Sequence, residues 1–452
     1  MTMTRSRMAP ALLFLAVSLG ACDGDLLDVK PVDEISEDIA IVDARSAQAA
    51  LVGAYSALQG GSYYGGAYVM WSETLTDNVE HTGTFDSYAD ADLVFLRPDM
   101  GGITGMWTVL YDGINRVNLL IQKVPAITSI DAADADAILG QAYALRALHY
   151  FNLVRAWGDV PLVLAPPATL DEAALVSRST TAQVYTQIAS DLGQAASLLS
   201  GLDNSSRTFV TPGFVTALQA RIALYQGDWA GAVARARALQ ATGEYSLAGS
   251  YGQLFTAGGD PTSEDIFRVA FTATDYNNLG YYYQYDGRFE IGATQEAYDL
   301  FDPADDRFAV NFNGVRSDGI QVVKFPTTIG GEDLHVIRYA DVLLILAEAL
   351  AEQDGAANLS EAVDQINAIR ARSGMAGYVY GVDLTTQQEV LDAVFLERRM
   401  ELAFEGEYWF DLVRTGRAAT AIGANFDAHE ALWPIPVSEL DVAPNLTQNP
   451  GY

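Results

Sequence analysis

Four carboxylates near the carboxyl end of the chain have a spacing that could support acid–base chemistry. Glu397, Glu401 and Glu405 recur at every fourth residue, and Asp411 follows them. Two carboxyl groups on either side of a glycosidic bond can hydrolyse it when one of them is held protonated. Residues four apart also share one face of a helix, and arginines lie among these glutamates. The spacing therefore favours structural ion pairs over a catalytic pair.

Other residue types that carry catalysis or bind metals are too few or too scattered to form a recognisable site. The four histidines, at positions 81, 149, 335 and 429, are far apart, and no HExxH spacing exists. The sequence contains no nucleophile elbow and no phosphate-binding glycine loop. Cys22 is the only cysteine, which excludes an internal disulfide and gives one possible metal ligand at most. We therefore predict no catalytic residue, no bound metal and no cofactor, and hence a protein that is not an enzyme.

Aromatic side chains gather in two segments that otherwise have the composition of loops. Residues 59–105 and 245–331 are rich in Gly, Tyr and Asp and lack a clear period. Aromatic rings match the apolar faces of sugar rings, while amide and charged groups match the hydroxyls. The candidate ligand-binding residues are Tyr63, Tyr64, Tyr68, Trp71, Tyr276, Asn277, Tyr281, Tyr282, Tyr283, Tyr285 and Arg288. The alternative is that these aromatic residues pack the loops onto a scaffold or contact a partner protein.

Helical periodicity predicts that the rest of the chain is mainly α-helical. A capped helix should start at Thr180 or Thr181, and short strands are expected near 266–272 and 319–325. Two helical hairpins are expected, with turns at Gly227 and Gly355. The main predicted helices are 40–58, 142–157, 214–225, 232–240, 361–372 and 387–406, and the tail from 426 should be irregular.

Paired helices with small residues at their contacts resemble tetratricopeptide repeats, although insertions break the period. Helical pairs form a rigid core, so long insertions between them must lie on its surface. We therefore expect the two aromatic segments to converge on one exposed face of the scaffold.

The first residues of the chain are typical of an exported lipoprotein. Arg5 and Arg7 precede an apolar stretch that is too short to span a bilayer, which predicts a signal peptide over residues 1–21. Leu19-Gly20-Ala21-Cys22 has the form of a lipobox, so we predict that Cys22 is lipidated and begins the mature chain. The alternative is a stray cysteine beside an ordinary cleavage site. Residues 22–37 are acidic and should form a tether, and no later stretch is apolar enough to span a membrane.

The charge of the chain excludes one class of partner. The formal net charge is −32, and it becomes −34 when the two arginines of the signal peptide are removed. Such a surface repels nucleic acid and other polyanions. We therefore expect no nucleic-acid partner and a neutral or weakly cationic ligand.

Several blocks, in order along nearly the whole chain, resemble the SusD/RagB family of outer-membrane nutrient-uptake lipoproteins. Each block is weakly specific alone, but together with the lipobox they are highly specific. The blocks include Trp157-Gly158-Asp159-Val160-Pro161-Leu162, Arg178-Ser179-Thr180, Arg338-Tyr339-Ala340-Asp341-Val342-Leu343-Leu344, Ile366-Asn367, Phe404-Glu405-Gly406, Phe410-Asp411-Leu412-Val413-Arg414, Trp433-Pro434-Ile435-Pro436 and Gln448-Asn449-Pro450-Gly451-Tyr452.

The resemblance implies both a fold and a partner. The fold is a single SusD-like domain over residues 38–452, a tetratricopeptide-like scaffold with loop-rich aromatic insertions. The partner is a TonB-dependent outer-membrane transporter of the SusC type, on which the protein forms a lid, and the ligand is a glycan or sometimes a peptide. Asp23, Asp25 and Asp28 are similar to surface-export signals of such lipoproteins. Asp23 directly after the cysteine favours the inner membrane in enterobacterial sorting, so the membrane address depends on the host.

The leading interpretation is a surface-exposed lipoprotein of the outer membrane that captures an oligosaccharide and delivers it to the transporter. Two alternatives remain at this point. The first is an envelope scaffold whose helical repeats dock other proteins, and the second is a carboxylate-dependent glycoside hydrolase.

Overall fold

A computed structural model describes residues 41–166, 169, 172 and 174–452 of the chain. The predicted signal peptide, the lipidation site Cys22 and the acidic tether lie outside the described residues. The fold is mainly α-helical, as the periodicity predicts, and its named strands are short and lie at residues 79–81 and between residues 265 and 338 of the described chain.

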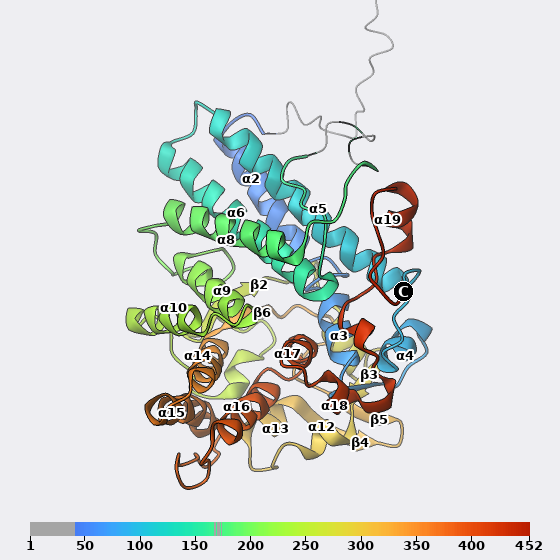
Figure 1. The fold of residues 1–452 in the computed structure, drawn as a ribbon, viewed down its shortest axis with the longest axis vertical. Helices are drawn as coiled ribbons and strands as arrows, with labels where there is room; N and C mark the ends of the chain where they lie inside the picture. The colour runs from blue at the N-terminus through green and yellow to red at the C-terminus, as the bar shows by residue number, and fades with distance from the viewer. Residues whose placement is uncertain (1–40, 167–168, 170–171, 173) are drawn as a thin grey trace, which may run out of the picture.

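Four long helices form one end of the molecule, at the top of Figure 1. They are α2 (Ala44–Leu58), α5 (Gly101–Lys123), α6 (Ala132–Trp157) and α8 (Thr181–Leu198). Local sequence sets where two of them begin, since Asp43 and Thr180 each accept a hydrogen bond from a backbone N–H of the first turn. The predicted cap at Thr180 is thus confirmed.

Two helical hairpins and a further helix extend the scaffold. They are α9 (Pro212–Tyr225) with α10 (Trp229–Thr242), α14 (Tyr339–Gln353) with α15 (Ala356–Arg372), and α16 (Gln387–Glu401). Gly227 and Gly355 lie at the two turns with φ of +67° and +90°, a region that glycine adopts without strain. Both predicted hairpins are confirmed, and α10 packs against α14, so the two hairpins are adjacent.

The C-terminal part contains more regular structure than the sequence predicts. It includes α17 (Tyr408–Arg414) and α18 (Ala418–Ile422). The tail from residue 426 contains α19 (Val437–Val442), so it is not wholly irregular. The tail is tied to the scaffold, since Trp157 Nε1 donates to the Pro434 carbonyl at 2.9 Å. Asn449 Nδ2 donates to the carbonyls of Trp157 and Trp433.

The segment 59–105 was expected to be rich in loops, and it contains more regular structure than this expectation. It contains α3 (Ala67–Thr74), β1 (Val79–His81) and α4 (Asp86–Asp92). Every residue of α3 from Tyr68 to Thr74 is buried. A helix covered on all sides has no polar face, so its sequence shows no amphipathic period.

Two small antiparallel sheets are formed mainly by strands of the later insertion. One has the order β1-β3-β5-β4, where β3 is Ile291–Ala293, β4 is Phe312–Arg316 and β5 is Gly319–Val322. The other pairs β2 (Asp265–Val269) with β6 (Leu334–Arg338). Short helices α11 (Leu279–Tyr283), α12 (Gln295–Asp299) and α13 (Asp306–Asn311) lie between the strands.

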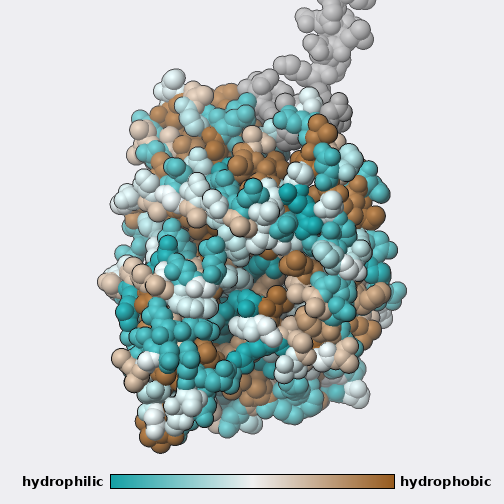
Figure 2. All heavy atoms as spheres, in the orientation of Figure 1, coloured by the Kyte–Doolittle hydropathy of each residue, from teal (hydrophilic) through white to brown (hydrophobic). Residues whose placement is uncertain are grey.

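One hydrophobic core runs from Ile41 to Leu446 and joins the helices to both insertions. Trp71, Trp157, Trp409 and Trp433 are among its largest buried side chains. On the face shown in Figure 2, hydrophobic residues are interspersed with hydrophilic ones. Among the residues that the structure describes, no helix combines the length and the apolar character needed to cross a bilayer.

Candidate functional site

The two aromatic segments lie side by side in the fold. Strand β1 of the first pairs with β3 of the second, with Val79 opposite Ala293. The backbone N–H of Asn278 donates to the Gly65 carbonyl at 2.8 Å. The two segments are therefore adjacent, as expected, although most of their predicted aromatic site residues are buried and do not form an exposed face.

Most aromatic residues of the first segment are core residues, which corrects the expectation that they line a ligand surface. Tyr63, Tyr64, Tyr68 and Trp71 are all buried. Asn152 Nδ2 on α6 donates to the hydroxyls of Tyr63 and Tyr64 at 2.6 and 2.9 Å, so these rings attach the segment to the scaffold. The Trp71 ring packs against Gly102 so closely that a Cβ there would lie 2.3 Å from it.

Two candidates of the second segment are also buried, and for these the expectation is wrong as well. The Tyr283 ring packs between Phe325 and Phe404, with ring centroids 5.9 and 6.0 Å away. Asn277 Nδ2 donates to the carbonyls of Gly330 and Glu332, which fixes the loop that carries its neighbours. Neither side chain can reach a ligand, because Tyr283 is packed in the core and the amide of Asn277 is hydrogen-bonded to the backbone.

Among the predicted site residues, the exposed aromatic ones are Tyr276 and Tyr281, whose side chains flank a surface pocket of about 410 Å³. Tyr276 is 55% exposed, Tyr281 42% and the facing Ile329 62%. Asn278 and Thr328 add an amide and a hydroxyl to the lining. Large apolar side chains are seldom this exposed together unless the surface binds something. The lining residues, Ala273 included, carry no carboxylate, so the pocket offers stacking and hydrogen bonding rather than acid–base chemistry.

A further exposed ring, Phe85, lies close to this pocket and was not among the predicted site residues. Its ring centroid is 6.3 Å from that of the half-buried Tyr282, which in turn lies 5.4 Å from Tyr281. The Arg288 guanidinium carbon lies 3.6 Å from the centre of the Phe85 ring. A single phenylalanine in an acidic stretch gave no periodic signal, so only the tertiary contact with Tyr282 identifies it.

A buried carboxylate, Glu290, fixes the position of Phe85. It accepts hydrogen bonds from the backbone N–H groups of Thr84 (2.8 Å) and Phe85, from Arg288 Nε (2.7 Å), and contacts His81 Nε2 at 3.2 Å. Burial raises the pKa of Glu290, but these donors outweigh burial and leave its pKa below the usual value. Glu290 is therefore charged at neutral pH and joins the two aromatic segments.

Tyr285 lies at the other side of the second segment and is half-buried. Its hydroxyl donates to the Gly319 carbonyl at 2.6 Å, and the Arg316 guanidinium lies 3.8 Å from its ring centre. These contacts hold the ring against the turn between β4 and β5. Tyr285 is therefore apart from the residues that line the pocket.

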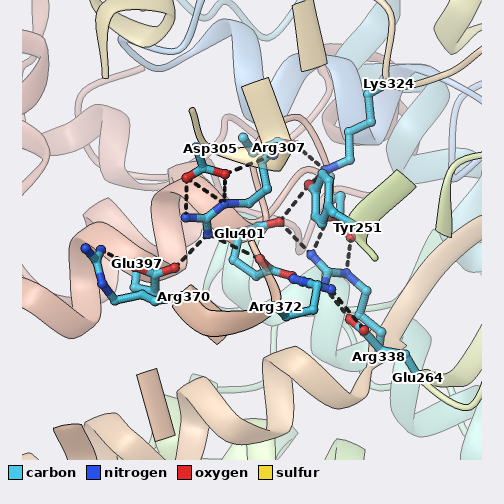
Figure 3. A network of polar contacts seen from close by, with 12 residues as sticks. Tyr251, Glu264, Asp305, Arg307, Lys324, Arg338, Arg370, Arg372, Glu397 and Glu401 are labelled. Atoms are coloured by element: carbon cyan, nitrogen blue, oxygen red, sulfur yellow. Dashed lines mark hydrogen bonds and ion pairs between the residues drawn. The ribbon is translucent and has the colours of Figure 1, made fainter. Parts of the chain in front are cut away.

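Glu397 and Glu401 on α16, and Glu405 in the turn that follows it, belong to a buried ion network, part of which is shown in Figure 3. Arg338 binds Glu401 and Glu405, while Arg307 Nη1 lies 2.7 Å from Glu397 and 3.3 Å from Glu401. Burial raises the pKa of Glu405, but Arg338 outweighs it and leaves the pKa at about 2. These carboxylates are enclosed by guanidinium groups, so their geometry suits a scaffold and not an acid–base pair.

Comparison with known proteins decides the family. Residues 276–452 match the family model described as the SusD family, and residues 25–224 match one described as starch-binding associating with outer membrane. The chain belongs to the SusD family. It is 26% identical to SusD-like protein P38 of Formosa agariphila, over 97% of this chain and 98% of that relative. It is also 31% identical to the starch-binding protein SusD of Bacteroides thetaiotaomicron, over a shorter stretch that covers 32% of this chain and 25% of that relative.

Solved structures of SusD-like proteins have the same fold. A laminarin-binding SusD-like protein matches with a TM-score of 0.77 and 26% identity, over 91% of this chain and all of that chain (100%). A SusD superfamily protein from Bacteroides thetaiotaomicron matches with a TM-score of 0.78 and 26% identity, over 90% of this chain and 100% of that one. The mainly α-helical architecture is thus a SusD-like fold.

Proposed function

We propose that this SusD-family protein is a surface-exposed outer-membrane lipoprotein that binds an oligosaccharide and passes it to a TonB-dependent transporter of the SusC type. The observation that carries the proposal is the pocket between Tyr276 and Tyr281, with its apolar, amide and hydroxyl lining. Relatives described as starch-binding and laminarin-binding support a glycan over a peptide.

The chemistry of the pocket fits a neutral sugar. A pyranose ring presents an apolar C–H face, which stacks on a tyrosine ring, and its hydroxyls bond to groups such as Asn278 and Thr328. Each such ring contributes on the order of 1 kcal/mol, so two or three exposed rings are needed for useful affinity. Tyr276, Tyr281 and Phe85 supply three exposed rings near one another.

The test is calorimetric titration of the purified protein with a glycan panel that includes laminarin and starch oligosaccharides. Tyr276→Ala and Tyr281→Ala should each weaken binding about five- to tenfold, and the double variant more. Both side chains are exposed, so the melting temperatures should stay close to that of the wild type. Tyr380→Ala, a partly exposed tyrosine between α15 and α16, is the matched control and should bind as wild type.

Two outcomes would contradict the binding site. If both tyrosine variants bind like the wild type, the pocket does not hold the ligand. If the wild type binds no glycan but releases reducing sugar from the panel, the protein is a hydrolase and the binding proposal fails.

The anchor and the transporter are tested separately. Cys22→Ala should move the protein from the membrane fraction to the soluble fraction, because lipid chains on Cys22 would be the attachment. Pull-down in mild detergent from the native host should recover a transporter barrel. Recovery of periplasmic assembly factors alone would favour the envelope-scaffold alternative.

A further inference from the structure

A second pocket, of about 500 Å³, lies on the helical scaffold and has no part in the proposed glycan site. It opens between the turn of the α9–α10 hairpin, the ends of α14 and α16, and α17. Three aromatic rings line it, from Tyr225, Trp229 and Phe395, and all three are half-buried. Aromatic side chains from three different elements around one cavity are typical of the lining of ligand pockets.

Two charged side chains of this pocket, Arg414 and Arg417, form ion pairs with carboxylates of the chain. Arg414 is held by Glu348, with Nη2 and Oε2 2.7 Å apart, and by Asp411 at 2.8 Å. Arg417 is paired with Asp392 and lies 4.4 Å from the centre of the Phe395 ring. Both lining arginines therefore already have their counter-ions.

Glu352 is the exception among the charged lining residues. Its carboxylate makes no hydrogen bond or ion pair within the part of the chain that the structure describes, although it is partly buried in the pocket wall. Burial and the neighbouring Glu348 both raise the pKa of Glu352, with Arg414 opposing them. A partly desolvated carboxylate is stabilised by a cation that enters the pocket.

We propose that this pocket binds a protonated amine, with the ammonium group against the Glu352 carboxylate and the aromatic rings around it. The face of the Trp229 ring carries negative electrostatic potential and attracts cations, while the Tyr225 and Phe395 rings already lie 5.4 and 4.4 Å from the guanidinium groups of Arg414 and Arg417. The net charge of −32 raises the local concentration of cations and lowers that of anions. Gln388 at the rim supplies an amide for a neighbouring hydroxyl or carbonyl of the ligand. The amine has two possible sources, an amino sugar or a lysine side chain.

The experiment titrates the purified protein with three probes by calorimetry. Glucosamine and Nα-acetyl-lysine amide carry the ammonium group, and N-acetylglucosamine lacks it. We expect at least one of the two amines to bind in the millimolar range or tighter, and the neutral sugar to bind far more weakly. Tighter binding of glucosamine identifies an amino sugar as the source, and tighter binding of the lysine derivative identifies a protein side chain.

Variants separate the charge from the shape of the pocket. Glu352→Gln keeps the size of the side chain and should weaken amine binding about tenfold, the effect of losing one charge-assisted hydrogen bond. Trp229→Leu keeps the charge of the pocket and should weaken amine binding several-fold. Glu361→Gln on α15 removes the same charge outside the pocket and is the matched control.

Three results would overturn the inference. They are equal binding of glucosamine and N-acetylglucosamine, wild-type amine affinity in Glu352→Gln, and no binding of either amine at millimolar concentration.

Discussion

Glu401 on α16 is the central carboxylate of the buried ion network, and its replacement by glutamine gives the clearest test of what the network does. Glu401 binds Arg338 and Arg372 through Oε1, and Arg307 at 3.3 Å through Oε2. The network pairs five cations with five carboxylates. The cations are Arg307, Lys324, Arg338, Arg370 and Arg372, and the carboxylates are Glu264, Asp305, Glu397, Glu401 and Glu405.

Glu401→Gln preserves the shape of the side chain and removes one of the five negative charges. One buried cation is then left without a counter-charge in a region that water does not reach. Breaking a buried ion pair in this way costs about 3–5 kcal/mol, so the free energy of unfolding should fall by that amount. The loss should appear as a lower urea midpoint with an unchanged m-value.

The assay is urea unfolding at pH 7, followed by circular dichroism and tryptophan fluorescence. Glu361→Gln is the matched control, since its ion pair with Arg237 is exposed on the surface of α15 and α10. The control should change the free energy of unfolding by less than about 1 kcal/mol. If Glu401→Gln lowers the free energy of unfolding no more than this control does, the network does not stabilise the scaffold and the reasoning is refuted.

Further predictions concern the buried groups Glu290, His149 and Glu405. Glu290→Gln should loosen the backbone of Thr84 and Phe85 and lower glycan affinity several-fold in calorimetry, while a glycan affinity equal to wild type would show that Phe85 is not part of the site. His149→Phe should raise the free energy of unfolding at pH 7 by about 1–3 kcal/mol in urea, because neither ring nitrogen of His149 has a hydrogen-bond partner among the described residues. Burial lowers the pKa of His149 in the folded state to about 3, whereas the pKa in the unfolded state is about 6.5. As the pH falls from 6.5 towards 3, the free energy of unfolding of the wild type should therefore decrease by about 1.4 kcal/mol per pH unit relative to that of His149→Phe. Parallel pH profiles of the two proteins would contradict this. The pKa of Glu405 is about 2 in the folded state and about 4.3 in the unfolded state. Glu405 therefore stabilises the fold above about pH 4.3, and this stabilisation is lost as the pH falls towards 2. Circular dichroism during acid titration should show unfolding within this window.

Local signals in the sequence predicted the scaffold well. The cap at Thr180 and the glycines at the turns of both hairpins appear where they were expected. Caps and turns depend on a few neighbouring residues, so they can be recognised without knowledge of the fold. The same local reasoning missed α3, because a helix buried on all sides carries no alternation of polar and apolar residues.

The spacing of Glu397, Glu401 and Glu405 predicted ion pairs on one helix face, and the structure confirms ion pairs. The spacing could not identify the partners of these glutamates, because Arg307 and Arg338 come from α13 and β6, many residues earlier in the chain. Contacts of this kind depend on how the elements pack and not on sequence spacing.

The sequence alone determined the helical scaffold, the two insertions and the resemblance to the SusD family, because each depends on local patterns or ordered blocks. Only the tertiary structure decided which aromatic side chains are free to bind. In the run Tyr281-Tyr282-Tyr283, the first ring is exposed, the second half-buried and the third fully buried. Three identical neighbours differ in this way because α11 turns one of its faces towards Phe325 and Phe404, which come from distant segments, and presents the other to solvent.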